Sequence, residues 1–277
     1  MHHGEGEIGW ELPYGFDFRG QTVRFNIVGS GEPLVFVHGT PFSSVVWRRI
    51  APHFTDRRIH YFDLLGYGQS DMRDGQDVSL AVQNELFAAL LAHWRLNRPD
   101  IVAHDFGGAT ALRTHLINKA DYASLLLIDP VAIAPWGSPF VQHVRKFEAA
   151  FSGLPAYIHE AILAAYVGGA AFRSLSPESL DLYCAPWRGE RGQAAFYRQI
   201  AQMDQRFTDE IAGRIPEIRC PVSIIWGEED QWIPIEQGRK LASMISNSQF
   251  RPVPGAGHLV QDDAPEAIVA TLKDFLG

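Results

Sequence analysis

The sequence has few of the residues that mark secreted, metal-binding or nucleic-acid-binding proteins. Only two of its 277 residues are cysteines, Cys184 and Cys220, and neither has a histidine or a cysteine at zinc-ligand spacing. Their positions suggest no disulfide, so a reducing cytoplasm is the simplest expectation. The formal net charge is −8 and the lysines and arginines form no cluster, which argues against a nucleic-acid partner.

Long apolar runs and a leader segment are also missing. The apolar run 125–128 stops at Asp129 and Pro130, well short of the roughly 20 apolar residues that span a bilayer. Residues 1–5 lack the basic region followed by an apolar region that defines a signal peptide. We therefore expect no membrane association. The 46% of hydrophobic residues suffices for a large core in one domain, or in one domain with an insertion.

Short apolar runs alternate with helix-like stretches through the first half of the chain. The expected strands are 22–28, 33–37, 59–62, 100–102 and 123–128, and the expected helices are 43–54, 79–94 and 109–117. This alternation predicts an α/β fold with a mostly parallel sheet and helices on both faces.

The alternation breaks after residue 129 and resumes near residue 220. Residues 130–219 contain helical segments, such as 140–151, 156–166 and 193–203, but no strong strand. The chain then continues with expected strands at 221–226 and 249–253 and helices at 236–245 and 265–275. We therefore expect a core domain of residues 1–129 and 220–277, with a helical cap of residues 130–219 inserted between two strands of its sheet.

The most informative stretch is the hexapeptide 103–108, Ala-His-Asp-Phe-Gly-Gly, which lies between an expected strand and an expected helix. A sharp strand–turn–helix with small residues on either side of a central residue is typical of a nucleophile elbow, whose centre is usually serine. Here the small residues are Ala103 and Gly107, and the centre is Asp105. Taken alone, the hexapeptide also fits an ordinary turn with Asp105 as a helix N-cap.

A nucleophile at such a turn needs a base and a group that orients the base. In open α/β sheets these groups lie in loops at the carboxyl ends of later strands. Asp230 follows the expected strand 221–226, and His258 follows the expected strand 249–253. The chain order Asp105, Asp230, His258 therefore matches the order of nucleophile, acid and base in one known hydrolase fold.

With these motifs in place, the chain resembles the α/β-hydrolases over essentially its whole length. The resemblance is carried by His38-Gly-Thr-Pro after an early strand, the elbow, the Gly-Glu-Glu-Asp turn that ends at Asp230, and the Gly-His that ends at His258. An aspartate at the elbow is similar to the branch of epoxide hydrolases and haloalkane dehalogenases. The resemblance implies a small-molecule substrate, no metal or organic cofactor, and a monomer or homodimer.

An aspartate nucleophile indicates attack at saturated carbon. A carboxylate that attacked an ester would form an unfavourable anhydride, whereas attack at an sp³ carbon forms a stable ester and needs a halide or a strained epoxide oxygen as leaving group. We expect His258 to activate the water that hydrolyses this ester, and Asp230 to orient His258. The resemblance assigns the backbone N–H groups of Phe106 and Thr40 to the oxyanion.

Two positions favour an epoxide over a halide. Haloalkane dehalogenases typically have tryptophan after the nucleophile, and many have asparagine third in the His-Gly-x-Pro motif, where this chain has Phe106 and Thr40. Phenylalanine donates no side-chain hydrogen bond, and threonine is a shorter donor than asparagine. Trp136 or Trp187 in the cap could supply the missing donor. Fluoroacetate dehalogenases differ further, because arginine follows their nucleophile.

Epoxide hydrolases use one or two cap tyrosines as proton donors, together with the His-Gly-x-Pro motif that here begins at His38. The resemblance assigns this role to Tyr197, within Phe-Tyr-Arg, and to Tyr157, with Tyr166 nearly as good. A cap tyrosine is more often half-buried packing with its hydroxyl at the surface. Trp136 and His38 complete the expected substrate-binding side chains.

We therefore expect an epoxide hydrolase with an alkyl-Asp105 intermediate, and a haloalkane dehalogenase with the same triad as the first alternative. A further alternative is a non-catalytic binding protein on this fold, since fold alone does not determine function. Asp129 follows the expected strand 123–128, where some dehalogenases have their acid, and is an alternative to Asp230. His104 is expected to face the packed core and not the substrate.

Overall fold

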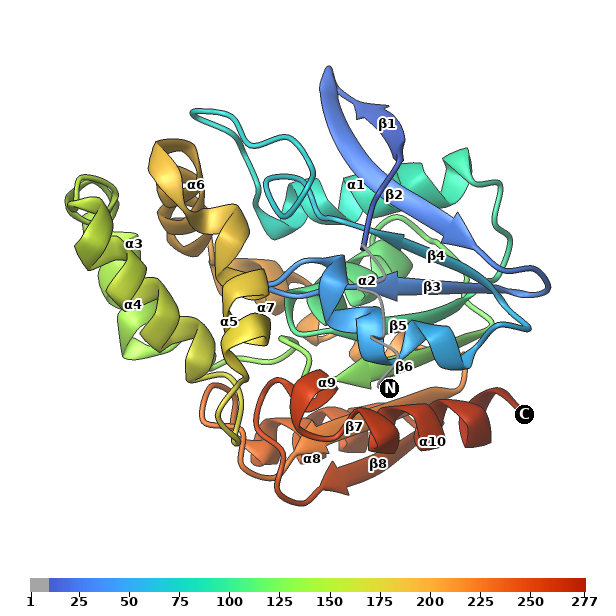
Figure 1. The fold of residues 1–277 in the computed structure, drawn as a ribbon. Coiled ribbons are helices and arrows are strands. Elements are labelled where there is room, and N and C mark those ends of the chain that lie inside the picture. The colour runs from blue at the N-terminus through green and yellow to red at the C-terminus, as the bar shows by residue number, and fades with distance from the viewer. Residues whose placement is uncertain (1–9) are drawn as a thin grey trace, which may run out of the picture.

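The computed structural model describes residues 10–277, so the expectation of no signal peptide at residues 1–5 lies outside the described residues. Eight strands form one sheet in the order β1-β2-β4-β3-β5-β6-β7-β8 (Figure 1). β2 is antiparallel to β1 and β4, and the other neighbours are parallel. The strands are β1 Tyr14–Phe18, β2 Gln21–Val28, β3 Pro33–Val37, β4 Arg58–Phe62, β5 Asp100–His104, β6 Ser124–Ile128, β7 Val222–Gly227 and β8 Ser248–Val253.

The inner strands consist largely of valine, leucine and isoleucine. A parallel strand that is covered by helices on both faces is buried along its length, which selects apolar residues at consecutive positions. Every residue of β6 and β7 is buried, whereas β8 at the edge of the sheet is only partly so. The carboxyl ends of β3, β5, β6 and β7 therefore meet at one well-packed edge of the core.

Helices cover both faces of the sheet, as the alternation of strands and helices predicts. Figure 1 shows α10 in front of the sheet and α1 with α2 behind it. Among residues 10–277, no helix has the length and apolar character needed to cross a bilayer. The core helices are α1 Leu80–His93, α2 Phe106–Leu116, α8 Ile235–Met244, α9 Val260–Asp263 and α10 Pro265–Leu276.

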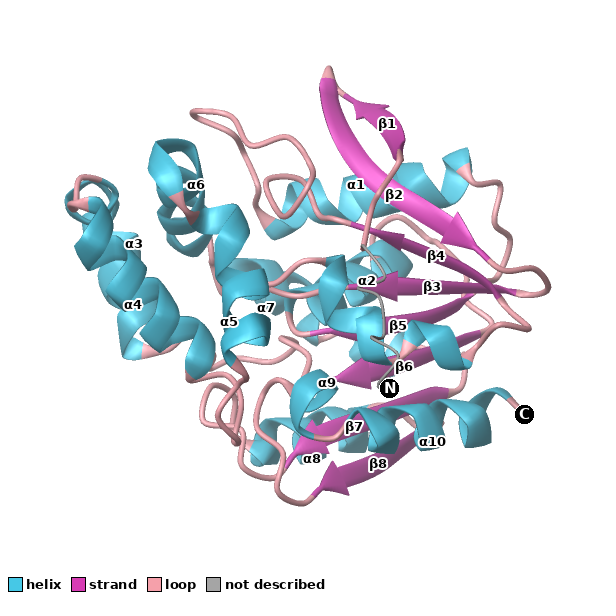
Figure 2. Ribbon diagram, in the orientation of Figure 1, coloured by secondary structure: helices cyan, strands magenta, loops and turns pink. Residues whose placement is uncertain are grey.

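Between β6 and β7 the fully described chain forms five α-helices and no strand. These inserted helices lie beyond the carboxyl ends of the parallel strands, on the left of Figure 2. They are α3 Pro139–Ser152, α4 Ala156–Gly168, α5 Pro177–Cys184, α6 Gly189–Ala201 and α7 Arg206–Ala212. The helical character expected for residues 130–219 is present, and the division into core and cap domains stays a prediction.

One expected helix is not continuous. The segment 43–54 forms two 3₁₀ helices, η1 Ser44–Arg49 and η2 Ala51–His53, so the expectation of a single helix is wrong. Pro52 explains the break, because proline has no N–H to donate and its ring clashes with the carbonyl four residues earlier. Two further 3₁₀ helices are η3 Ala185–Trp187 and η4 Ile215–Glu217.

Candidate active site

Asp105 occupies a strained turn between β5 and α2. Its backbone has φ of +51° and ψ of −118°, which is rare for a residue other than glycine. A Cβ on Gly107 would lie 2.3 Å from the carbonyl oxygen of Val37, and one on Gly39 would lie 2.4 Å from Cβ of Asp105, so neither position has room for a side chain. Asp105 makes no capping hydrogen bond to α2, which removes the alternative of a simple N-cap.

The carboxylate of Asp105 is held by a backbone N–H group. Thr40 donates its N–H to Oδ1 at 2.8 Å. Asp105 is only 3% exposed. One of the two donors that the resemblance assigns to an oxyanion, Thr40, therefore bonds to this carboxyl group, and Oδ2 is left to face His258.

The structure brings Asp105, His258 and Asp230 together from the ends of β5, β8 and β7. Nδ1 of His258 lies 2.8 Å from Oδ2 of Asp230, and Nε2 lies 3.3 Å from Oδ2 of Asp105. The other oxygen of Asp230 accepts the N–H groups of Trp232 at 2.7 Å and Ile233 at 3.0 Å. Asp230 is thereby fixed with one oxygen on the imidazole, which is the arrangement that orients a base.

Burial and charge act in opposite directions on the pKa values of this group. Burial lowers the pKa of His258, but the charges of Asp230 and Asp105 outweigh burial and raise this pKa well above its usual value. Burial raises the pKa of Asp105, but the hydrogen bond and charge of His258 leave this pKa below its usual value. Asp105 is therefore ionised at neutral pH.

Asp129 lies beside these three residues but makes no hydrogen bond to the imidazole of His258. Its Oδ1 accepts the N–H of Gly227 at 3.0 Å, while Oδ2 has no hydrogen-bond donor among the described residues. The hydrogen bond to Nδ1 of His258 comes from Asp230. Of the two acids that the sequence left open, the geometry therefore joins Asp230 to the base.

A small cavity of about 30 Å³ adjoins Asp105. Its wall contains Thr40, Phe106 and Trp136, the last two in edge-to-face contact with ring centroids 5.8 Å apart. Tyr166 of α4 and Trp232 form another part of the wall. Such a small, mostly aromatic cavity over a buried carboxylate suits a small apolar substrate.

An aromatic stack connects the inserted helices to the base. The Trp232 ring lies 4.6 Å from the ring of Tyr166 and 4.9 Å from that of His258, both in stacked arrangements. Sequence reasoning ranks Tyr166 behind Tyr157 and Tyr197 and assigns no role to Trp232. The position of Trp232, two residues after Asp230, is a signal that could have indicated it.

The two tyrosines favoured from the sequence do not reach the cavity. Tyr157 is 72% exposed on the outer face of α4. Tyr197 is buried among the inserted helices, and its hydroxyl lies 3.1 Å from Nδ1 of His159. The placement of Tyr157 and Tyr197 as proton donors is therefore corrected, and Tyr166 is the tyrosine of the inserted helices that lines the cavity.

Two histidines near the site, His38 and His104, form hydrogen bonds with backbone groups. His38 accepts the N–H of Leu64 on Nε2 at 2.8 Å, so its Nδ1–H donates to the carbonyl of Gly39 at 2.9 Å. Both ring nitrogens are thus occupied, which corrects the expectation that His38 binds substrate. His104 donates from Nε2 to the carbonyl of His258 at 3.0 Å, and burial lowers its pKa to about 3. As expected, His104 faces the packed core.

The two cap tryptophans proposed as halide donors direct their indole N–H groups elsewhere. Trp136 lines the cavity, but its N–H donates to Oγ1 of Thr208 at 2.8 Å. Trp187 donates its N–H to the carbonyl of Pro41 at 2.7 Å. Neither indole N–H is free for a leaving group in this structure.

Gln199 of α6 is a polar residue near the site that the sequence did not indicate. It is 2% exposed, and its side-chain oxygen accepts the hydroxyls of Thr40 and Tyr67. The hydroxyl of Thr40 is therefore engaged by the inserted helices, while its backbone N–H bonds to Asp105. A single glutamine within a helix carries no sequence signal for such a contact.

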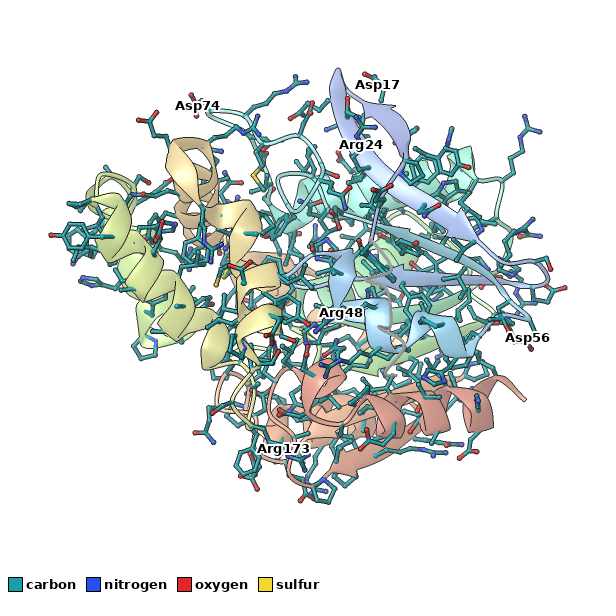
Figure 3. The ribbon with its side chains drawn as sticks, in the orientation of Figure 1. Asp17, Arg24, Arg48, Asp56, Asp74 and Arg173 are labelled. Carbon is teal, nitrogen blue, oxygen red and sulfur yellow. The ribbon has the colours of Figure 1, made fainter. Side chains whose placement is uncertain are left out.

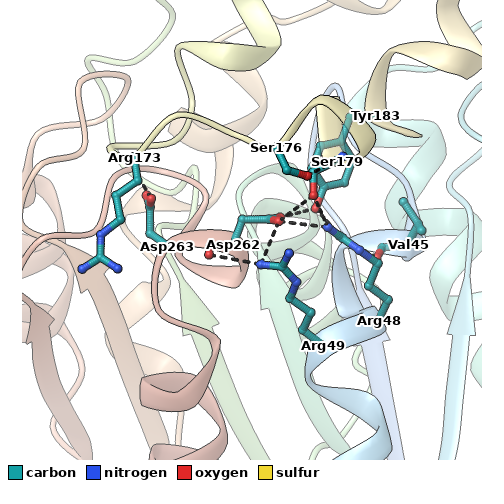
Figure 4. Close-up of polar contacts among 9 residues, drawn as sticks. All are labelled: Val45, Arg48, Arg49, Arg173, Ser176, Ser179, Tyr183, Asp262 and Asp263. Carbon is teal, nitrogen blue, oxygen red and sulfur yellow. Dashed lines mark hydrogen bonds and ion pairs between the residues drawn. The ribbon is translucent and has the colours of Figure 1, made fainter. Parts of the chain in front are cut away.

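The inserted helices are also tied to the core behind the site. Arg48 of η1 donates to Tyr183 and Ser179 of α5 and to Asp262 of α9 (Figure 4). Figure 3 shows Arg48 at the junction between the core and the inserted helices. We call Arg48, Ser179, Tyr183 and Asp262 the junction cluster. Because Asp262 lies four residues after His258, the cluster fixes the segment that carries the base.

Comparison with known proteins gives the same fold and several hydrolase relatives. The crystal structure of an α/β-hydrolase fold protein from Burkholderia ambifaria is 56% identical, covers 95% of this chain and 98% of its own, and superposes with a TM-score of 0.93. A 2-hydroxy-6-oxo-2,4-heptadienoate hydrolase from Pseudomonas putida is 27% identical over 93% of both chains. A fluoroacetate dehalogenase from a Burkholderia species is 26% identical over 92% of this chain and 90% of its own.

A family model covers most of the chain. The model described as the alpha/beta hydrolase family matches residues 34–271, from the start of β3 to near the end of α10. The elbow and the Asp105–His258–Asp230 geometry lie within this range. The chain belongs to the α/β-hydrolase family.

Proposed function

We propose that the protein hydrolyses small substrates at a saturated carbon, through a covalent ester on Asp105. The observation that supports this proposal is the carboxylate of Asp105 at a strained elbow, between the backbone N–H of Thr40 and the imidazole of His258. An ionised carboxylate needs no base to attack an sp³ carbon. An ester of that carboxylate is in turn a good substrate for water activated by a histidine.

In the first step, Oδ2 of Asp105 forms a bond to the substrate carbon while the bond from that carbon to the leaving oxygen breaks. The electron pair goes to the leaving oxygen, and the hydroxyl of Tyr166 supplies its proton. Oδ2 is the attacking atom because Oδ1 is engaged by the N–H of Thr40. The products of this step are an ester on Asp105 and a tyrosinate at Tyr166.

In the second step, Nε2 of His258 takes a proton from water, and the hydroxide attacks Cγ of Asp105. Nε2 lies 3.3 Å from Oδ2 of Asp105, so it faces the ester group that the water attacks. The N–H groups of Thr40 and Phe106 stabilise the oxyanion. When the ester bond breaks, the acid proton formed on Asp105 passes to the leaving alkoxide, and His258 returns its proton to Tyr166.

An epoxide is the substrate class that the donors around the cavity fit best. A departing epoxide oxygen needs one proton, and we assign its transfer to the hydroxyl of Tyr166, a residue that lines the cavity. A departing halide needs N–H donors, whereas Phe106 has none in its side chain and the indoles of Trp136 and Trp187 donate elsewhere. We therefore propose an epoxide hydrolase.

Dehalogenation is the second candidate, and a specific observation favours it. A relative 26% identical over 92% of this chain is a fluoroacetate dehalogenase. The same Asp105, His258 and Asp230 would serve, with a carbon–halogen bond breaking in the first step. The residue after the nucleophile argues against a fluorinated acid, because Phe106 offers no positive charge to a carboxylate.

The decisive experiment stops the reaction at the ester. The His258→Ala variant, incubated with a panel of small epoxides and a panel of haloalkanes, is weighed intact by mass spectrometry and digested to locate any adduct. An adduct on Asp105 from epoxides supports the proposal, and one from haloalkanes supports the second candidate. His53→Ala, which removes an exposed histidine, is the matched control and should show no adduct.

Absence of both adduct and turnover with either panel would contradict both enzymatic candidates and leave a non-catalytic binding protein. Oxygen-18 water gives an independent check on the ester. In a single turnover of the unmodified enzyme, the oxygen added to the product should come from Asp105 and carry no label. The label should then appear in the Asp105 carboxylate.

A further inference from the structure

Asp129 is a buried carboxyl group for which the mechanism so far has no use. It is fully buried at the end of β6. Its φ is +41°, a backbone conformation that residues other than glycine rarely adopt. Oδ1 accepts the N–H of Gly227, and Oδ2 has no donor among the described residues. A charged oxygen with no hydrogen bond in a buried site is unfavourable, so Oδ2 requires an explanation.

The neighbours of Asp129 make a second negative charge more unfavourable still. One oxygen each of Asp129 and Asp230 and one ring nitrogen of His258 lie within 4.8 Å of one another. A hydrogen bond between the two carboxyl groups requires a proton on one of them. When two carboxyl groups share a buried site, one keeps its proton because like charges cannot both be stabilised.

Hydrogen bonding decides which of the two is the anion. Asp230 accepts three N–H groups, from Trp232, from Ile233 and from Nδ1 of His258. Asp129 accepts one, from Gly227. The carboxyl group with three donors is the better place for the negative charge, and the one with a single donor is the better place for the proton.

The electrostatic balance at Asp129 agrees with this assignment. Burial, followed by the charge of Asp230, raises its pKa well above the usual value, against the opposite effect of His258. Asp230, from the loop after β7, and His258, from the loop after β8, are the titratable groups that face it among the described residues. No arginine or lysine of residues 10–277 forms an ion pair with Asp129.

We propose that Asp129 is a positioning residue: a neutral carboxylic acid whose O–H donates a hydrogen bond to Asp230 and thereby holds Asp230 against His258. The neutral acid supplies one more hydrogen bond to the Asp230 carboxylate and adds no charge to the site. The role rests on the proposed function of His258 and Asp230 as base and acid, and it holds for an epoxide and a halide alike. Asp129 touches neither the substrate nor the reacting atoms.

Asparagine tests this proposal directly, because its amide has the shape of the neutral acid and can both donate and accept. In Asp129→Asn we expect kcat to stay within about threefold of the unmodified enzyme, whereas Asp129→Ala falls further because Asp230 loses a donor. Asp230→Asn should lose at least about 100-fold, since an amide cannot stabilise the imidazolium. The reverse ranking of the two asparagine variants would overturn the proposal.

A spectroscopic measurement makes the test independent of any substrate. A protonated carboxylic acid has a carbonyl-stretching band in the infrared that a carboxylate lacks. The difference spectrum between the unmodified protein and Asp129→Asn at pH 7 should show that band, and exchange into D₂O should shift it. A carboxylate signal in its place would overturn the proposal, even if the proposed function itself failed for want of turnover.

Discussion

At the scale of single residues, Asp105 and His258 set each other's pKa values. The charge of Asp105 is one of the effects that raise the pKa of His258. Forming the ester removes this charge, so the pKa of His258 should fall when the intermediate forms. A lower pKa favours the neutral imidazole in the intermediate, where a base is needed.

The variant Asp105→Asn tests this coupling, because asparagine carries no charge and so resembles the ester electrostatically. We expect the pKa of His258 to be lower in Asp105→Asn than in the unmodified protein, while remaining above that of a free histidine because of Asp230. Titration of the His258 ring by NMR measures both values. An unchanged pKa would show that Asp105 does not control the base.

A second residue-scale prediction concerns the proton donor. Tyr166→Phe removes the hydroxyl at the cavity wall and should lower kcat for an epoxide by about 100-fold or more, the usual contribution of a general acid. Tyr197→Phe is the matched control, because that hydroxyl lies against His159 away from the cavity. If the two variants lost activity equally, the donor would have to be another group.

At the scale of elements, helix geometry explains why the expected tyrosine was the wrong one. Tyr157 and Tyr166 are nine positions apart on α4, about two and a half turns, so they project from opposite faces. The sequence supplied the helix but not which face meets the core, since that depends on how α4 packs against other inserted helices. The bounds of the strands were easier to predict than the buried face of α4, because burial on both faces of β3, β6 and β7 selects continuous apolar runs in the sequence.

The junction cluster supports a prediction about how the inserted helices are attached. Arg48→Met removes the donors to Tyr183, Ser179 and Asp262, and leaves the 4%-exposed carboxylate of Asp262 with less compensation. We expect the free energy of unfolding to fall by about 2–4 kcal/mol, as measured by urea denaturation. Hydrogen exchange should become faster in α5.

Arg49→Met is the control for this cluster. Arg49 pairs with the same Asp262 at 3.3 Å, but its own side chain is 45% exposed, so its loss should cost less than about 1 kcal/mol. Equal losses in the two arginine variants would show that the buried hydrogen bonds of Arg48 do not attach the inserted helices. The cluster would then be a surface ion pair only.

At the scale of the whole molecule, the sequence predicted the sheet, the inserted helices and the three residues at the strand ends. Asp105, Asp230 and His258 could be found because each follows a strand, and the carboxyl ends of parallel strands meet at one edge. The contacts of Tyr166 and Gln199 at the site, and the pairing of Asp129 with Asp230, could not be predicted from the sequence. Those contacts join segments far apart in the chain, and no spacing encodes them.

The pH dependence of folding stability shows how a buried acid affects the whole molecule. The pKa of Asp129 is raised in the folded state above its ordinary value of 3.8, so the folded protein binds a proton that the unfolded chain releases. The free energy of unfolding therefore decreases as the pH rises from about 4 to the pKa of Asp129 in the folded protein. The slope is up to about 1.4 kcal/mol per pH unit. The raised pKa of His258 has the same sign, so its contribution is lost as the pH rises through the folded value.

Asp129→Asn removes the first of these two effects and leaves the second. We expect its free energy of unfolding to be similar to that of the unmodified protein near pH 4, and to exceed it increasingly toward about pH 8. Urea denaturation at several pH values gives the two curves. Curves that stay parallel across this range would mean that Asp129 is ionised in the folded protein, because only a proton retained on folding can make them diverge.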